Sequence, residues 1–110
     1  MSLLGRWLIL EMDLWDQDAV NLLVPGFFEF HEDRTGRFSF IAVQGWMDLR
    51  PTRIDNRPGV EFSWEGVDDN VDASGRGWAI LDGEGSLQGR IFFHMGDDSG
   101  FRARRDVSPT

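Results

Sequence analysis

Short runs of alternating apolar and polar residues follow one another along this chain, separated by turn-forming residues. The clearest run covers residues 60–66, where Val, Phe and Trp alternate with Glu and Ser. A period of two is typical of a strand with one buried and one exposed face. The same criterion predicts strands over residues 4–14, 27–31, 37–44, 46–54, 60–66, 77–82, 86–95 and 101–106.

The segments between these runs contain turn signals. Gly, Pro, Asn and Asp predict reversals at residues 32–36, 55–59, 83–85 and 96–100, and the polar residues 67–75 predict a longer loop. We expect a left-handed conformation at Gly36 and a bulge or hinge at Gly45. The one plausible helix covers residues 16–23, with Asp16 as its cap, although a single helical turn fits equally well.

These elements predict one all-β domain over residues 1–110, with a frayed tail at residues 107–110. Consecutive hairpins favour an antiparallel up-and-down β-barrel of about eight strands, which leaves no free edge. A two-sheet β-sandwich is the alternative, because it also consists of many short strands. A parallel sheet is excluded, since no strand is followed by a long helix and another strand.

The first and last strands contain a recognisable pair of features. Gly5-Arg6-Trp7 begins the first strand, and Arg102 and Arg104 lie in the last. In this the chain resembles the calycins (lipocalins, fatty-acid-binding proteins and avidins), where a Gly-x-Trp packs near a basic residue of the last strand. The resemblance implies that Gly5, Trp7 and either Arg102 or Arg104 close one end of the barrel, with guanidinium stacked on indole. A functional site would then lie at the other end.

Composition and charge exclude several functions. The chain has no Cys, so it has neither a disulfide framework nor a thiolate zinc site. The absence of disulfides and of a signal-peptide pattern favours the cytoplasm. No apolar run approaches the roughly 20 residues that span a bilayer. A net charge of −8 disfavours nucleic acid and anionic membranes as partners.

One facet of a predicted strand combines polar groups with an aromatic ring: Gln44, Trp46, Asp48 and Arg50. Pointing inward, these side chains would form a ligand-binding site with an aromatic wall. Pointing outward, they are ordinary surface residues. We favour the outward or rim position, because buried charges are costly unless they are paired.

The remaining candidate chemistry is weak, and we predict no catalytic residue, metal site or cofactor. Both histidines adjoin turn acids without the spacing of a metal site. Glu61 and Glu65 lie on the polar face of their strand, and the alternating residues 68, 70 and 72 lack the rest of a calcium loop. The side chains that could act as metal ligands are those of His31, Glu32, Asp33, His94, Asp97, Asp98, Asp68, Asn70 and Asp72.

Two functions remain open. The first is binding of a small apolar or aromatic molecule in the barrel mouth, suggested by nine Phe and five Trp. The alternative is a protein-interaction or homodimerising module whose barrel is filled by side chains. An apolar first strand and the expected exposure of Ile41 and Val43 suit a homodimer. Enzymatic activity is a third alternative, for which the sequence has no motif.

Overall fold

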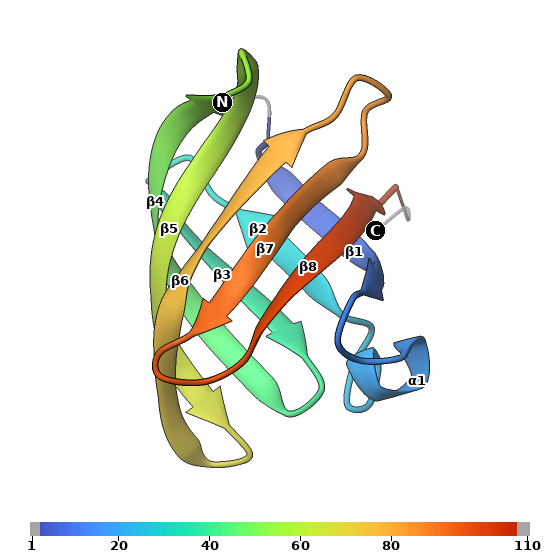
Figure 1. Ribbon diagram of the computed structural model, residues 1–110, viewed down its shortest axis with the longest axis vertical. Coiled ribbons are helices and arrows are strands. Elements are labelled where there is room, and N and C mark those ends of the chain that lie inside the picture. The colour runs from blue at the N-terminus through green and yellow to red at the C-terminus, as the bar shows by residue number, and fades with distance from the viewer. Residues whose placement is uncertain (1–2, 108–110) are drawn as a thin grey trace.

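Eight antiparallel strands form a closed barrel in the computed structural model, which describes residues 3–107 (Figure 1). Each strand pairs with its neighbours in the sequence, and the last strand pairs with the first. The prediction of an up-and-down barrel is therefore confirmed, and the sandwich alternative is wrong. The elements are β1 (Gly5–Met12), α1 (Gln17–Val20), β2 (Phe27–Phe30), β3 (Thr35–Phe40), β4 (Val43–Ile54), β5 (Arg57–Asp68), β6 (Val71–Leu81), β7 (Leu87–Phe93) and β8 (Asp98–Arg105).

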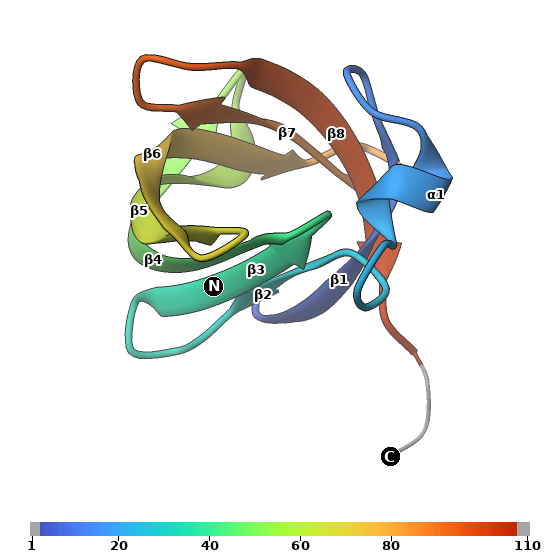
Figure 2. The ribbon, with the colours of Figure 1, turned by 90° about the horizontal axis from the view of Figure 1, so that it is seen from below.

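The two ends of the barrel differ. At one end, here the Trp7 end, β1 begins and β8 finishes, and Trp7 pairs with Arg105. At the other, here the α1 end, the chain leaves β1 and forms α1 beside the barrel opening (Figures 1 and 2). The long hairpin of β5 and β6 curls past the same end (Figure 2). Any site in the barrel mouth would lie at this α1 end.

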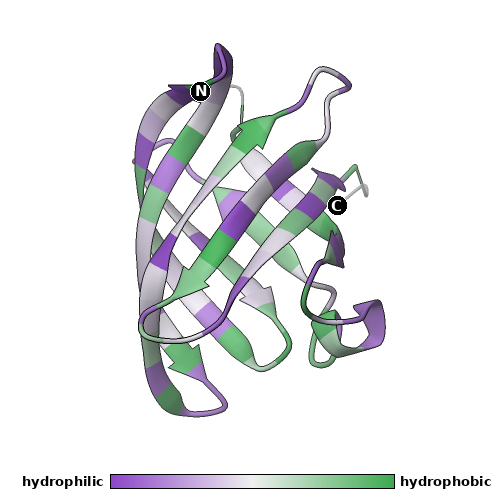
Figure 3. Ribbon diagram, viewed as in Figure 1, coloured by the Kyte–Doolittle hydropathy of each residue, from purple (hydrophilic) through white to green (hydrophobic). Residues whose placement is uncertain are grey.

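Alternation along the strands separates an apolar interior from a polar exterior. Figure 3 shows hydrophobic and hydrophilic residues following each other along most strands. In β4, every second residue from Val43 to Leu49 is buried and those between are exposed. This is the physical consequence of side chains that project to opposite faces at successive positions. Large side chains buried in the core include Trp7, Phe28, Phe30, Phe38, Phe40, Leu49, Phe62, Trp64, Ile91 and Phe101.

Aromatic rings fill the barrel as a continuous column. Each ring contacts the next in a stacked, tilted or edge-on geometry, the arrangements that aromatic pairs prefer. The centroid distances between successive members are 4.3, 5.3, 5.0, 5.2 and 6.3 Å along the column Phe101–Phe28–Phe38–Trp64–Phe93–Trp15. The column ends with Trp15 at the α1 end, where the segment between β1 and α1 covers the barrel.

The neighbouring strands β5 and β6 are longer than their sequence pattern indicated. The expected loop over residues 67–75 is wrong, because β5 continues to Asp68 and β6 begins at Val71. Asp69 and Asn70 make the reversal in left-handed conformation, with φ of 49° and 69°. Asp and Asn tolerate this conformation better than most residues, so two of them suffice for a turn. Polar residues in 67–75 therefore belong to an exposed hairpin rather than to a loop.

The expected boundary between the strands over residues 37–44 and 46–54 is also wrong. β3 ends at Phe40, the chain reverses at Ile41 and Ala42, and β4 begins at Val43. Ile41 adopts a left-handed φ of 56°, and its N–H donates a hydrogen bond to the carbonyl of Val20 at 2.9 Å. A β-branched residue rarely occupies this region, so this turn could not be predicted from the residue types.

Two glycines have other roles than those expected. Gly45 is neither a bulge nor a hinge, because it pairs regularly with Phe38 and Gly66. A Cβ at Gly45 would collide with the ring of Phe38, so this glycine makes room for a core side chain. The left-handed residue of the β2–β3 turn is Arg34, with φ of 65°, rather than Gly36.

A bulge in β1 reverses the expected facing of its last residues. Ile9 pairs with Ala103 and Glu11 with Arg102, which leaves Leu10 as an extra residue. Met12 therefore turns into the core, while Leu10 stays exposed. The first strand is consequently less apolar on its outer face than its sequence indicated.

The helix prediction is confirmed only as a single turn. Asp16 caps α1 by accepting a hydrogen bond from the N–H of Ala19 at 2.9 Å. Gln17 fixes the turn to the barrel, since its Nε2 donates to the carbonyl of Ile9 at 2.8 Å. The expected frayed tail at residues 107–110 falls outside the described residues, apart from an exposed Val107.

Candidate functional site

The Trp7 end is closed by an arginine stacked on an indole. Trp7 is fully buried, and its Nε1 donates to the carbonyl of Leu3 at 2.9 Å. The guanidinium carbon of Arg105 lies 4.2 Å from the centre of the Trp7 ring. Arg105 also donates to the carbonyl of Leu4 at 2.6 Å. The expected pairing of Trp7 with a basic residue of the last strand is present, but with a different arginine.

Strand parity explains why neither Arg102 nor Arg104 takes this position. Phe101 and Ala103 are buried in the barrel, so Arg105 continues the inward row and Arg102 and Arg104 face outward. Arg102 instead forms an ion pair with Glu11 at 3.1 Å. Gly5 precedes Trp7 with a left-handed φ of 108°, a conformation that favours glycine.

The α1 end is covered by an aromatic side chain. The ring of Trp15 lies 5.7 Å from that of Phe40 and 6.3 Å from that of Phe93. Ile41 packs partly buried against the same core, and Val43 is buried, so the expected exposure of Val43 is wrong. The mouth where a ligand was expected is therefore lined by side chains that already contact one another.

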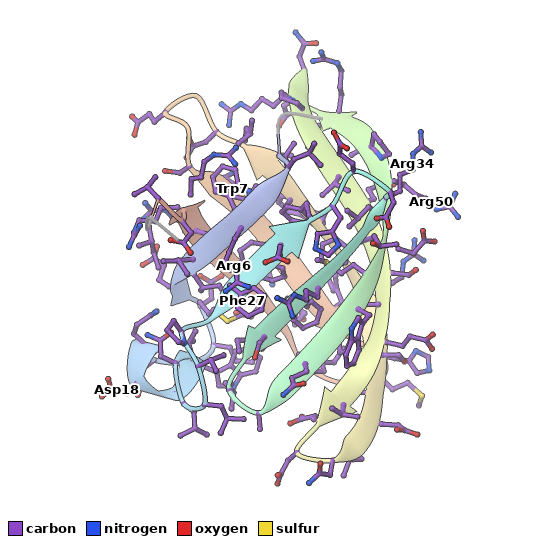
Figure 4. All side chains as sticks on the ribbon, turned by 180° about the vertical axis from the view of Figure 1, so that it is seen from behind. Arg6, Trp7, Asp18, Phe27, Arg34 and Arg50 are labelled. Carbon is purple, nitrogen blue, oxygen red and sulfur yellow. The ribbon has the colours of Figure 1, made fainter. Side chains whose placement is uncertain are left out.

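The predicted facet of Gln44, Trp46, Asp48 and Arg50 faces outward along β4. The structure places all four side chains on one face, as the alternation indicated, and that face is the barrel exterior. Trp46 has 56% of its surface exposed. Asp48 and Arg50 form an open ion pair at 3.7 Å. Figure 4 shows Arg50 extending away from the barrel. These residues thus belong to a surface rather than to an enclosed pocket.

This facet is part of a larger surface, which we call the outer wall: the outward-facing residues of β4, β5, β6 and β7. Two cross-strand rows define its centre. One row joins Trp46 to Glu65 and Ser74, and the next joins Asp48, Ser63, Arg76 and Phe92. Trp78 follows Arg76 on the same face of β6. The sequence pattern did not predict Arg76, Trp78 or Phe92 as site residues, because each lies in a strand of mixed pattern.

Three hollows adjoin on the outer wall, with volumes of about 790, 780 and 610 Å³. Trp46 and Glu65 line the first two, and Ser63 lines the second and third. Trp78 and Phe92 form the apolar walls of the third, beside Arg76. The hollows form where large aromatic side chains stand next to small serine side chains. The wall therefore offers exposed apolar surface in shallow depressions, which is the form of a protein-binding surface more than of an enclosed ligand site.

Arg76 lies at the centre of this wall, beside the aromatic rings of the third hollow. Within the described residues it makes no hydrogen bond or ion pair, whereas Arg90 pairs with Asp13 and Asp98. Ser63 and Phe92 flank it on the neighbouring strands. A guanidinium beside aromatic rings is suited to a carboxylate that approaches together with apolar groups.

A separate charged cluster ties together β1, β2 and β3. The carboxylate of Glu29 accepts from Arg6 at 2.8 Å and from Arg37 at 3.2 Å, and pairs with His31 at 2.9 Å. Burial would raise the pKa of Glu29, but hydrogen bonds from His31 and Arg6 and the charge of Arg37 lower it to about 2. Arg6 also lies over the Phe27 ring, 4.1 Å from its centre (Figure 4). A carboxylate so stabilised is a poor proton acceptor, so this cluster serves the fold.

The other candidates for metal or acid–base chemistry do not converge. Among residues 3–107, no group of three or more His, Cys, Asp and Glu side chains is placed to hold a metal ion. His94 is exposed in the β7–β8 turn, where its backbone N–H donates to the carbonyl of Ser74 at 2.8 Å. Within the same residues, no helix has the length and apolar character to cross a membrane.

Comparison with known proteins assigns no family: no family model, no curated protein and no solved structure matches the chain. The function must therefore be argued from the geometry of this barrel.

Proposed function

We propose that this chain is a protein-interaction module that binds its partner through the outer wall. The observation that carries this proposal is the contrast between a barrel filled by the aromatic column and a wall on which rings stand exposed. Trp46 and Phe92, with 56% and 38% of their surfaces exposed, lie outside on neighbouring rows. Rings exposed in this way are typical anchors of protein interfaces.

The partner surface that fits the wall combines carboxylates with apolar side chains. Arg76 supplies an unpaired guanidinium, while Trp78 on the same strand and Phe92 on β7 supply apolar surface beside it. An acidic side chain would pair with Arg76, and neighbouring apolar groups would enter the hollows. This complementarity favours an acidic and apolar segment over a basic one.

The fold we assign to this module is a small calycin-like barrel. The support is Gly5-Arg6-Trp7 on β1 with Arg105 stacked on Trp7, which is the arrangement that the resemblance implies. The lack of cysteine supports a cytoplasmic location. A small apolar ligand in the mouth has less support, because Trp15, Phe40 and Phe93 already contact one another there.

A peptide array tests the proposal. Peptides of equal length and equal apolar content would contain Asp and Glu, Asn and Gln, or Lys and Arg. We expect the labelled protein to bind the acidic set and R76E to lose at least tenfold in affinity. R104E is the matched control, because Arg104 is an exposed arginine of β8 outside the wall. Equal retention of all three sets, or an unchanged affinity in R76E, would contradict the proposal.

A further inference from the structure

The outward row of β6 has opposite charges at equal distances from a small residue. Asp72, Ser74 and Arg76 face outward at successive alternate positions. Asp72 and Arg76 each lie two residues from Ser74, or about 7 Å at the usual rise of a strand. Both charged side chains are exposed, and neither has an ionic partner among residues 3–107.

The charges of this row are complementary to those of a second, identical row in the opposite orientation. In an interface with two-fold symmetry, the same patch of each copy meets its rotated equivalent, so it must present opposite charges on the two sides of the axis. An axis that passes over Ser74, parallel to the wall and at right angles to β6, places Asp72 of each copy opposite Arg76 of the other. Facing walls at the usual spacing of packed sheets, about 10 Å, bring such side chains within reach of each other.

We propose that the partner of the outer wall is a second copy of this chain, docked by a two-fold axis at Ser74. This inference rests on the proposed function and names its partner. The chain itself supplies what the wall requires, since Asp72 is the carboxylate for Arg76. Two reciprocal ion pairs form in the dimer, and each satisfies a charge that is unpaired in one copy alone.

The surroundings of Ser74 provide the apolar part of this interface. Trp46 and Glu65 lie in the same cross-strand row as Ser74. The hollow of about 790 Å³ is lined by Trp46, Asp72 and Ser74 together. The proposed axis therefore passes beside a depression that has an exposed indole at its edge. Burial of this ring against the second copy supplies the hydrophobic contribution to association.

The net charge of −8 opposes association in general, so the local pairing must offset a repulsion between copies. We expect a reversible dimer whose population rises with concentration. Sedimentation equilibrium over a concentration series would measure it, with circular dichroism to verify that each variant is folded.

Three variants test the two-fold arrangement. In R76E two acidic side chains face each other across each contact, and in D72R two arginines do so. Each single change should therefore weaken the dimer at least tenfold. The double variant D72R/R76E restores opposite charges at both contacts and should recover dimerisation to within about threefold of the original. R104E, a charge reversal outside the wall, should leave the dimer unchanged.

The outcomes separate this inference from the function on which it rests. A chain that stays monomeric at all concentrations but binds the acidic peptides overturns the second copy as partner and keeps the interaction module. Failure of both measurements overturns both proposals. A dimer that R76E and D72R leave intact uses another surface, which also overturns the inference. Folded single variants that are monomeric, with a double variant that does not recover, would contradict the axis at Ser74.

Discussion

Trp7 and Trp46 occupy opposite faces of the same barrel, and almost everything about their surroundings differs. Trp7 is fully buried, with its Nε1 bonded to a backbone carbonyl and its ring covered by Arg105. Trp46 lies on the outside of β4 with more than half of its surface in solvent. Because one position along a strand changes the face, parity rather than residue type decides which aromatic residue stabilises the fold.

The aromatic rings inside the barrel and those on the outer wall also differ in their surroundings. Inside, the rings contact one another in an unbroken column from Phe101 to Trp15. Outside, Trp46, Trp78 and Phe92 are separated by serines and charged residues, with hollows between them. A filled interior leaves the exterior as the surface available for recognition. Four substitutions test this division between stability inside and recognition outside.

The largest effect is expected for Trp7→Ala. Removal of a fully buried indole leaves a cavity at the Trp7 end and leaves Arg105 without its ring. We expect a loss of about 3–5 kcal/mol in the free energy of unfolding, measured by urea denaturation. A loss below about 1 kcal/mol would mean that Trp7 does not hold this end of the barrel closed.

Glu29→Gln should have an intermediate effect, on the order of 1–2 kcal/mol at neutral pH, because three partly exposed partners lose a charged acceptor. The pKa of Glu29 falls from its ordinary 4.5 to about 2 on folding. Its contribution is therefore complete above about pH 4.5 and disappears as the pH falls to about 2. The difference in unfolding free energy between the original chain and E29Q should shrink across that window. A constant difference would contradict the ionic role of Glu29.

A smaller effect is expected for Arg105→Ala, of about 0.5–1 kcal/mol, from the loss of the contact with Trp7. Arg104→Ala is the matched control, since Arg104 neighbours it in sequence but faces outward. Thermal unfolding of the two variants should place R105A below R104A. The reverse order would mean that the guanidinium over Trp7 adds nothing to stability.

The smallest effect on stability is expected for Trp46→Ala, within about 0.5 kcal/mol, because its ring lies largely in solvent. Its effect on the proposed dimer should be large in comparison, at least tenfold in dissociation constant by sedimentation. If W46A unfolds as readily as W7A, the division between the two faces would be wrong.

The barrel could be predicted from sequence because its strands alternate and its hairpins follow one another. The clearest case is β5, whose residues 60–66 alternate almost strictly. Prediction failed where local chemistry contradicted the structure. Ile41 makes a turn although isoleucine favours strands, and residues 67–75 form a hairpin although they are polar. The bulge at Leu10 depends on pairing with β8, which no local pattern reveals.

Some features of the candidate site could likewise be predicted from the sequence, and others could not. The shared face of Trp46, Asp48 and Arg50 follows from alternation and was predicted correctly. The arginine over Trp7 could also have been chosen correctly, because Phe101 and Ala103 mark the inward face and Arg105 continues it. The outer wall could not be assembled from sequence, since it depends on the registers of four strands. Arg76 meets Phe92 only through such a register.

The pairing of β1 with β8 has a consequence for the order in which the barrel forms. Every other strand pair joins neighbours in the chain, so each can start as a local hairpin with little loss of chain entropy. The pair of Trp7 and Arg105 instead closes a loop of nearly the whole chain. We therefore expect the pairing of β1 with β8 to limit the folding rate. Substitutions in this strand pair should slow folding more than equally destabilising substitutions in a single hairpin.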